Sequence, residues 1–340
     1  MTDPMQLPAD ALSAYFEAHV AGFLGPLTAT KFKGGQSNPT YLIEAASGKY
    51  VLRRKPPGKL LPSAHAVDRE FRVLQALHGG PVPVARPLHL CTDDAVIGSM
   101  FYLMDFVDGR VHWDPSLPGM EPAQRTAHYE AIIATLAALH SLDPATLGLA
   151  DYGKPGNYFQ RQVHRWTEQY RASETQPIPA MDALIDLLPA RCPEDDGRVA
   201  LVHGDFRIDN LMFAADAPRV LAVVDWELST LGHPLADLGY FCMALRLPRN
   251  PALPGLAGLD REALGIPSEA ALLARYCELS GQPAPADWPF VLAFSFFRLA
   301  AIAQGVAKRA QQGNASSEQA AQAGQMTALL ATQGLSLVKP

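Results

Sequence analysis

Residues 201–210 read "LVHGDFRIDN", an apolar run that ends in a loop dense in polar side chains. Asp205 lies in this loop, and Asn210 opens the next apolar stretch. A further apolar run, "VLAVVD", ends at Asp225. We expect the strand before Asp225 to form a hairpin beside the strand before Asp205, because short apolar runs separated by turn residues are typical of hairpins. This pairing would bring three oxygen-bearing side chains to one rim.

This set of side chains suits phosphoryl transfer. Mg²⁺ is usually bound by one or two carboxylates together with substrate phosphates. Two carboxylates and one amide would meet at this rim, so a cation could be bound while one carboxylate stays free to hold an acceptor hydroxyl as catalytic base. Phosphoryl transfer depends on this division of labour between positioning, a base and a cation that neutralises phosphate charge.

The composition excludes several classes of protein. The chain has 340 residues, a net charge of −6 and 48% hydrophobic residues, so it can form a sizeable core but shows no basic excess for nucleic acid. Its four cysteines have no CxxC spacing, and its first residues do not resemble a signal peptide. The apolar stretch 290–306 is interrupted by Arg298 and Gln304, which indicates a buried helix. We expect a cytoplasmic protein that binds neither nucleic acid nor membrane.

The pattern along the chain changes near residue 106. Before it, alternating or apolar runs separated by Gly, Ser, Asn and Pro predict an antiparallel meander, and a helical spacing of apolar residues predicts one helix. The predicted strands are 27–33, 40–45, 49–55, 88–93 and 99–107, and the helix is 66–78. After residue 106 most segments are helical, apart from short strands within 199–228. The expected domains are therefore 1–106 and 107–340.

The sequence resembles a known family at several places. His203, Asp205 and Asn210 fit the pattern H-x-D-x-x-x-x-N, and Asp225 follows as in kinases. The variant "HGD" is similar to that of aminoglycoside phosphotransferases and choline kinases. The segments 153–170, 225–240 and 297–309 also resemble the phosphotransferase domain fused to acyl-CoA dehydrogenase family members ten and eleven. The resemblance implies an α+β fold of the protein kinase-like, two-lobed type, with an antiparallel-sheet N-lobe and a mainly helical C-lobe.

The resemblance also implies roles for particular residues. It makes Asp205 the catalytic base, and Asn210 and Asp225 the metal ligands. Arg53 stands at the third-strand position where the family usually has lysine, and Glu70 matches its helix partner. Val51 shares a strand face with Arg53 and is expected to line the adenine pocket. The other expected nucleotide contacts are the phosphate-covering loop residues Gly35, Ser37 and Asn38, and the hinge residues Met104, Asp105 and Phe106. The loop departs from the pattern G-x-G-x-x-G, since Gly34 and Gly35 are adjacent and Ser37 and Asn38 replace the later glycines.

Several residues near Asp205 have structural alternatives. Arg207 stands where protein kinases place a phosphate-contacting lysine, and we assign it to the catalytic set, with a salt bridge inside the loop as its alternative. His203 follows a buried strand and is expected to be structural. Asp209 is expected to brace the loop. Asp237 resembles the aspartate that ties the catalytic loop to a helix.

The reaction expected is ATP-dependent phosphorylation of a small-molecule hydroxyl, with Mg²⁺. Only eleven residues separate Asp225 from Asp237, so a platform for a peptide substrate has little room. The resemblance favours a hydroxyacyl-CoA or hydroxy acid as acceptor, bound through cations on the helix of Arg161, Arg165 and Arg171 or in 297–309. An apolar tail of this acceptor is expected to lie along Phe296, Phe297 and Leu299. An aminoglycoside or amino alcohol is the alternative acceptor, and an inactive ATP-binding scaffold is the alternative from another class. The sequence leaves open the oligomeric state and the choice between ATP and GTP.

Overall fold

The computed structural model describes residues 7–32, 38–56, 65–250, 254–311 and 320–339. The chain divides into two compact units, residues 1–110 with 211–229, and residues 111–210 with 230–340. The chain leaves the first unit close to the expected boundary at residue 106. The segment 211–229 nevertheless belongs with the N-terminal residues, partly because the amide of Val223 donates to the carbonyl of Pro83 at 2.8 Å.

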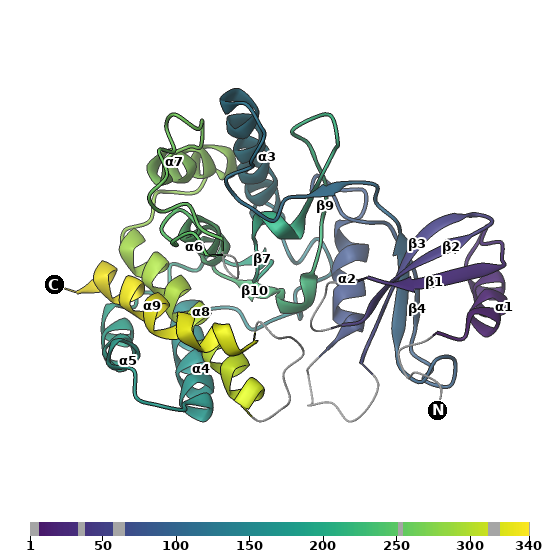
Figure 1. Cartoon of the computed structure of the whole chain (residues 1–340), viewed down its shortest axis with the longest axis horizontal. Helices are drawn as coiled ribbons and strands as arrows, with labels where there is room; N and C mark the ends of the chain where they lie inside the picture. The colour runs from purple at the N-terminus through teal and green to yellow at the C-terminus, as the bar shows by residue number, and fades with distance from the viewer. Residues whose placement is uncertain (1–6, 33–37, 57–64, 251–253, 312–319, 340) are drawn as a thin grey trace. The chain divides into compact units, whose positions relative to one another are not determined.

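The first unit is built on a five-stranded antiparallel sheet (Figure 1). Its order is β1-β2-β3-β5-β4, so the expected meander of the first three strands is present. The hydrogen-bonded neighbours are antiparallel throughout. The strands are β1 (Leu27–Lys31), β2 (Thr40–Ala45), β3 (Gly48–Arg54), β4 (Pro87–Cys91) and β5 (Phe101–Asp105).

One helix covers each face of this sheet. Arg53 is in register with Tyr102, and the ring of Tyr102 contacts Phe71 of α2 (Val67–Leu77) at 5.8 Å between centroids. Leu52 is in register with Leu103, and both belong to the apolar cluster that includes Phe16 of α1 (Ala9–His19). Because successive strand residues point to opposite faces, the alternation of β3 turns Arg53 toward α2 and Leu52 toward α1.

The strand pairing around Asp225 corrects the sequence-based prediction. The strand before it, β9 (Val220–Val223), pairs antiparallel with β8 (Leu211–Phe213) in a small sheet whose order is β6-β8-β9, where β6 is Arg110–Val111. The strand before Asp205, β7 (Ala200–Val202), pairs instead with β10 (Thr230–Gly232). A hairpin between β8 and β9 needs only the short turn at 214–219. β9 therefore pairs with β8, its neighbour in sequence, and not with the more distant β7.

Most of the second unit is helical. The helices that the sequence predicted are present with these bounds: α3 (Pro122–His140), α4 (Tyr158–Ser173), α5 (Pro179–Arg191), α7 (Glu269–Ser280), α8 (Trp288–Gln311) and α9 (Ala320–Val338). α8 packs against α4, α6 and α9, which places it in the core of this unit (Figure 1). By length and composition α8 could cross a membrane, but 83% of its apolar window is buried inside the protein, as a core helix requires.

Sequence reasoning missed the helix α6 (Leu235–Met243). Each of its nine residues is buried, including Asp237 and Tyr240. A helix that is buried on every side has no polar face, so its sequence lacks the 3.6-residue alternation that reveals a surface helix. α6 begins after the strand β10 and carries residues that lie under the catalytic-loop segment 203–210.

Candidate active site

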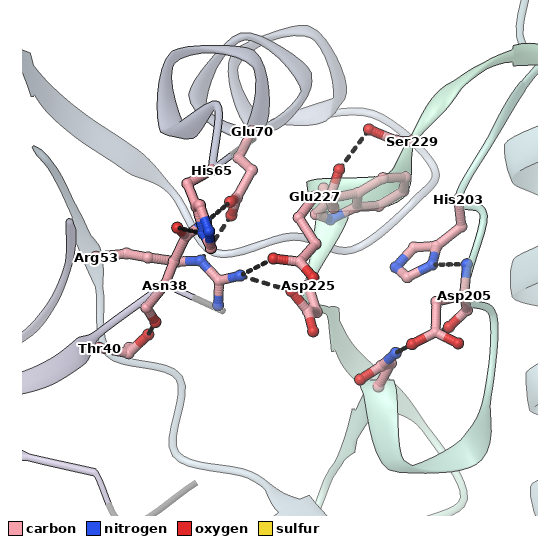
Figure 2. A network of polar contacts seen from close by, with 12 residues as sticks. Asn38, Thr40, Arg53, His65, Glu70, His203, Asp205, Asp225, Glu227 and Ser229 are labelled. Carbon is pink, nitrogen blue, oxygen red and sulfur yellow. Dashed lines mark hydrogen bonds and ion pairs between the residues drawn. The ribbon is translucent and has the colours of Figure 1, made fainter. Parts of the chain in front are cut away.

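Arg53 is the centre of an ion-pair cluster in the first unit. Its Nε lies 2.8 Å from Glu70 Oε2, which confirms the predicted pair. Its Nη2 donates to Asp225 Oδ1 at 2.6 Å and lies 3.5 Å from Glu227 Oε2. Figure 2 shows the guanidinium pointing toward Asp225 and Glu227. The pKa of Arg53 lies above its usual value because the surrounding carboxylates, Glu70 first, outweigh burial, which would lower it. Arg53 is thus a permanent buried cation held by three carboxylates.

Glu70 is fixed from several sides. It is 2% exposed, and it accepts hydrogen bonds from the amide of Asn38 at 2.7 Å and the hydroxyl of Tyr102 at 3.1 Å. Burial raises the pKa of Glu70, while Arg53 and these two donors oppose the rise. Glu70 of α2 is therefore a fixed carboxylate that can orient the guanidinium of Arg53.

Asn38 has a different position from the one expected of a phosphate-covering residue. Its side chain is fully buried, its amide nitrogen donates to Glu70, and its amide oxygen lies 3.0 Å from His65 Nδ1 (Figure 2). The side chain therefore supports the Arg53–Glu70 pair and has no exposed donor to offer a phosphate. Gly35 and Ser37, the other two residues assigned to the phosphate loop, lie outside the described residues.

Asp225 has an unusual backbone conformation. Its φ of 66° and ψ of 60° lie in the left-handed region, which few residues other than glycine adopt, although aspartate tolerates it better than most. This turn follows β9 at once and begins the 3₁₀ turn Trp226–Leu228. Residues held in sparsely populated backbone regions cluster at functional sites. The conformation directs the carboxylate of Asp225, which is 34% exposed, toward Arg53.

The remaining residues assigned to the nucleotide site lie along β3 and β5. Val51 is 8% exposed and in register with Met104, so both share the sheet face of Arg53, as alternation predicted. Asp105 accepts two hydrogen bonds from Arg86, at 2.8 and 3.3 Å. Phe106 follows the strand, and its ring lies 6.0 Å from the ammonium of Lys49. Val51 and Met104 therefore offer apolar surface, while the side chain of Asp105 is already engaged.

Asp205 and Asn210 lie together in the second unit. The amide nitrogen of Asn210 donates to the backbone carbonyl of Asp205 at 2.8 Å and to its carboxylate Oδ2 at 3.2 Å. The backbone amide of Asp205 donates to Nδ1 of the fully buried His203 at 3.2 Å (Figure 2). His203 is therefore structural, as expected. The Asn210 amide nitrogen faces Asp205, so its amide oxygen points the other way and is suitable as a ligand for a cation.

Asp237 fixes the backbone that precedes Asp205. Its carboxylate is fully buried and accepts from the backbone amides of His203 at 2.6 Å and Gly204 at 2.8 Å. It also lies 3.2 Å from Nε2 of His140, whose Nδ1 lies 2.8 Å from the hydroxyl of Tyr276. The pKa of Asp237 is lowered, because these hydrogen bonds outweigh burial, which would raise it. Asp237 has the scaffold role that the sequence suggested.

Arg207 forms the salt bridge that was its structural alternative. Its Nε donates to Asp209 Oδ1 at 3.0 Å, and its Nη2 pairs with Asp209 Oδ2. Asp209 braces the loop, as expected. Despite burial, which would lower it, the pKa of Arg207 is raised by Asp209 and other acidic neighbours. The side chain of Arg207 is still one-third exposed, so it retains surface for a ligand.

A cavity in the second unit adjoins this loop. Arg207 and Asp209 contribute its polar edge, and its wall is mostly aromatic and aliphatic. Trp113 lies at this cavity with 70% of its surface exposed, an unusual exposure for so large an apolar ring. The other main lining residues are Tyr129, Tyr240, Leu245, Leu247 and Leu299. The cavity can therefore hold an apolar group beside the salt bridge between Arg207 and Asp209.

The arginines of α4 each have a partner within the second unit. Arg171 pairs with Glu174 and Asp182, and Arg161 donates to the carbonyls of Lys154 and Pro155. Arg165 lies over the ring of Trp166 at 5.7 Å. The expected apolar surface at residues 296 and 297 is also absent, because both phenylalanines are fully buried in the core. Of the residues proposed to hold an acyl tail, Leu299 alone reaches the cavity.

The donor set suits Mg²⁺ better than a transition metal. Within the described residues no three side chains of His, Cys, Asp or Glu gather into a metal site. Mg²⁺ needs only one or two carboxylates, because substrate phosphates and water complete its shell. The carboxylate of Asp225 in the first unit and the amide oxygen of Asn210 in the second are each a hard oxygen ligand of this kind, so the chemistry of each side chain suits the cation.

The fold and the site define a kinase-like phosphotransferase. An antiparallel sheet with an anchored cation–carboxylate pair precedes a helical unit whose loop carries Asp205 and Asn210. The chain belongs to the phosphotransferase enzyme family, whose pattern matches residues 28–291.

Two curated relatives carry the matching segment inside longer chains. Acyl-CoA dehydrogenase family member 10 of Mus musculus is 49% identical over 329 residues, which cover 96% of this chain and 31% of the relative. Acyl-CoA dehydrogenase family member 11 of Rattus norvegicus is 46% identical over 332 residues, covering 96% of this chain and 43% of the relative. This chain thus spans less than half the length of either relative.

Solved structures support the same family. A crystal structure from Ralstonia eutropha, provisionally named an aminoglycoside phosphotransferase, is 51% identical, has a TM-score of 0.90 and covers 98% of this chain and 99% of its own. The aminoglycoside phosphotransferase APH(4)-Ia, in a complex with ADP and hygromycin B, has a TM-score of 0.62 at 13% identity, with 97% of this chain and 99% of the other covered. The latter likeness shows the fold alone.

Proposed function

We propose that this protein transfers the γ-phosphoryl group of ATP to the hydroxyl of a small molecule that carries an apolar portion, such as a hydroxyacyl-CoA or a hydroxy acid. The observation that carries the proposal is the geometry of Asp205. Asn210 holds its carboxylate, Asp237 fixes the backbone before it, and the loop it belongs to borders an apolar cavity. A carboxylate held in this way suits a base that orients an acceptor hydroxyl.

The proposed transfer balances simply. The acceptor O–H bond breaks as its proton passes to the carboxylate of Asp205. A bond forms between the acceptor oxygen and the γ-phosphorus, and the bond from that phosphorus to the β,γ-bridging oxygen breaks, so ADP leaves. Asp225 and Asn210 would hold Mg²⁺, which neutralises charge on the phosphates. Arg53 holds the carboxylate of Asp225 in place, and Val51 and Met104 offer the apolar surface for adenine.

The cavity beside Arg207 and Asp209 supports this acceptor class. Its wall is mostly apolar, and the one charged pair at its edge is internally neutralised. A polycationic aminoglycoside would need several carboxylates directed into such a site. The phosphotransferase segments of the acyl-CoA dehydrogenase relatives add to the case for an acyl acceptor.

An aminoglycoside or other amino alcohol is the second candidate acceptor. It is favoured by the name of the Ralstonia eutropha protein, which is 51% identical over almost the full length of both chains. The acidic Asp209 at the edge of the cavity is the described residue that would best meet a single ammonium group.

The test is ADP release from Mg-ATP across matched panels of hydroxyacyl-CoAs, hydroxy acids, aminoglycosides and amino alcohols. We expect turnover with a hydroxyacyl compound, with a gain of one phosphoryl group in the product mass. Turnover of aminoglycosides alone would overturn the proposed acceptor class and leave the proposed phosphotransferase activity intact. Binding of ATP without turnover of any acceptor, together with an Asp205→Asn variant that behaves like the wild type, would favour an inactive scaffold.

A further inference from the structure

A buried arginine lies beneath the loop that carries Asp205. Arg298 of α8 is 5% exposed, and its Nη2 donates to the backbone carbonyl of Gly204. Its guanidinium carbon lies 5.2 Å from the ring centroid of Tyr240 and 5.5 Å from that of Trp166. A cation held between two aromatic faces and aimed at a single carbonyl is an expensive arrangement to bury, so it needs a reason beyond packing.

Gly204 is bound at both ends of its backbone by buried charges of opposite sign. Its amide donates to Asp237 at 2.8 Å, and its carbonyl accepts from Arg298. Its φ of 84° lies in the left-handed region, which glycine adopts at no steric cost. With both polar groups held, the orientation of the peptide that leads into Asp205 is fixed.

Tyr240 connects the same cluster to the carboxylate. It is 4% exposed and lines the cavity beside the loop. Burial raises its pKa, and the nearby Asp205 adds to the rise, while Arg207 and Arg298 oppose it. The tyrosine hydroxyl is therefore a neutral donor close to Asp205, and its ring is one of the two faces that hold Arg298.

We propose that Arg298 is a positioning residue for Asp205: clamped between Trp166 and Tyr240, it holds the Gly204 carbonyl and so fixes the backbone from which the base projects. This inference rests on the proposed role of Asp205 in phosphoryl transfer. The Nε of Arg298 is buried with no hydrogen-bond partner among the described residues, so the side chain is not optimised for stability alone. Misplacement of a catalytic group by about 1 Å can cost on the order of 100-fold in rate.

The decisive variant is Arg298→Met, which keeps a long side chain between the rings and removes the charge and the donor. Replacing a buried charge with an apolar group of similar size often leaves a protein as stable as before. We expect kcat to fall about 10- to 100-fold, with the KM values for ATP and acceptor nearly unchanged. Arg298→Lys keeps a cation that can reach the carbonyl and should lose less.

The matched control is Arg191→Met on α5. Arg191 also donates to a backbone carbonyl, that of Val338 at 2.9 Å, but its side chain is 39% exposed and its described partners lie outside the catalytic loop. Its kinetics should equal those of the wild type. A second readout, independent of the acceptor, is amide hydrogen exchange in a peptide spanning residues 201–210, which should accelerate in Arg298→Met and stay unchanged in Arg191→Met.

Each outcome separates the two proposals. Wild-type kcat and wild-type exchange in a folded Arg298→Met protein would overturn the positioning role and leave the phosphotransferase proposal intact. A wild-type protein that phosphorylates no acceptor would defeat the proposed function, while the exchange experiment would still show whether Arg298 holds the loop. If Arg298→Met does not fold, Arg298→Gln, which removes the charge and shortens the side chain, decides: exchange and kcat equal to the wild type would contradict the proposal.

Discussion

Arg53 Nη2 and Asp225 Oδ1 lie 2.6 Å apart, although 172 residues separate them along the chain. The same carboxylate is the proposed Mg²⁺ ligand, so the buried guanidinium fixes one oxygen of Asp225 and leaves the other for the cation. This contact ties the third strand of the sheet to the segment after β9. It explains why arginine can replace the usual lysine, because the planar fork reaches Glu70 and Asp225 at the same time.

Replacing Asp225 with alanine should abolish the binding of Mg-ATP while leaving metal-free nucleotide binding largely intact. The variant deletes a proposed metal ligand, and it also leaves one end of the Arg53 fork without its nearest acceptor. Calorimetry with ATP, with and without Mg²⁺, measures both effects. Glu44→Ala is a useful control, because the ion pair of that exposed glutamate among the described residues is with the exposed Lys49. Equal Mg-ATP affinity in the wild type and in Asp225→Ala would show that the metal is held elsewhere.

Asp205→Asn should lower kcat by roughly 10²- to 10⁴-fold, the usual contribution of a positioned general base. Its affinity for Mg-ATP should stay close to that of the wild type, since Asp205 orients the acceptor. Single-turnover rates together with ATP titrations separate the two effects. A parallel loss of ATP affinity and rate would argue for a metal-binding role for Asp205.

Glu70→Ala should destabilise the first unit by about 3–5 kcal/mol, as expected when one member of a buried ion pair is removed. Arg53 would lose its anchor, and Asn38 and Tyr102 would lose their acceptor. Urea unfolding measures the loss. In a cycle with Arg53→Ala, we expect a coupling energy of about 0.5–3 kcal/mol. Strictly additive effects would contradict a direct pair.

Asp237→Asn should be less stable than the wild type at neutral pH, and the difference should shrink in acid. The folded-state pKa of Asp237 is lowered from its ordinary value of 3.8, so its ionised form contributes stability above that value. This contribution is lost as the pH falls through 3.8 toward the folded-state pKa. Unfolding free energies of both proteins, measured from pH 7 down to about pH 3, test the trend. A constant difference would show that the charge of Asp237 is irrelevant.

Trp113→Ala should raise the KM for the acceptor by about 5- to 30-fold, equivalent to losing 1–2 kcal/mol of contact with an apolar group. The KM for ATP and the unfolding free energy should change little, because the ring is 70% exposed. Leu24→Ala, also at an exposed apolar residue, is the control and should leave both KM values unchanged. An unchanged acceptor KM would place the acceptor outside this cavity.

Local patterns carried most of the information about the fold. Alternation in residues 40–54 and helical spacing in 67–77 predicted the sheet, α2 and the common face of Val51 and Arg53, because both periods follow directly from backbone geometry. The spacing of His203, Asp205 and Asn210 indicated the reaction class for a similar reason. These residues lie within one short loop, so their mutual reach hardly depends on the rest of the chain.

The tertiary structure decided what depends on contacts between distant segments. The partner of the strand before Asp205 is β10, and Asn38 is turned inward to Glu70; neither follows from local sequence, since several partners were equally compatible with it. Arg298 looked like an interruption in an apolar stretch, and only the fold brings it to the carbonyl of Gly204, 94 residues away. Local periodicity and motif spacing thus determined the secondary-structure elements and the reaction class. Long-range packing determined which side chains position the catalytic residues. The physical reason is that a buried charge is stable only beside the partners that folding supplies.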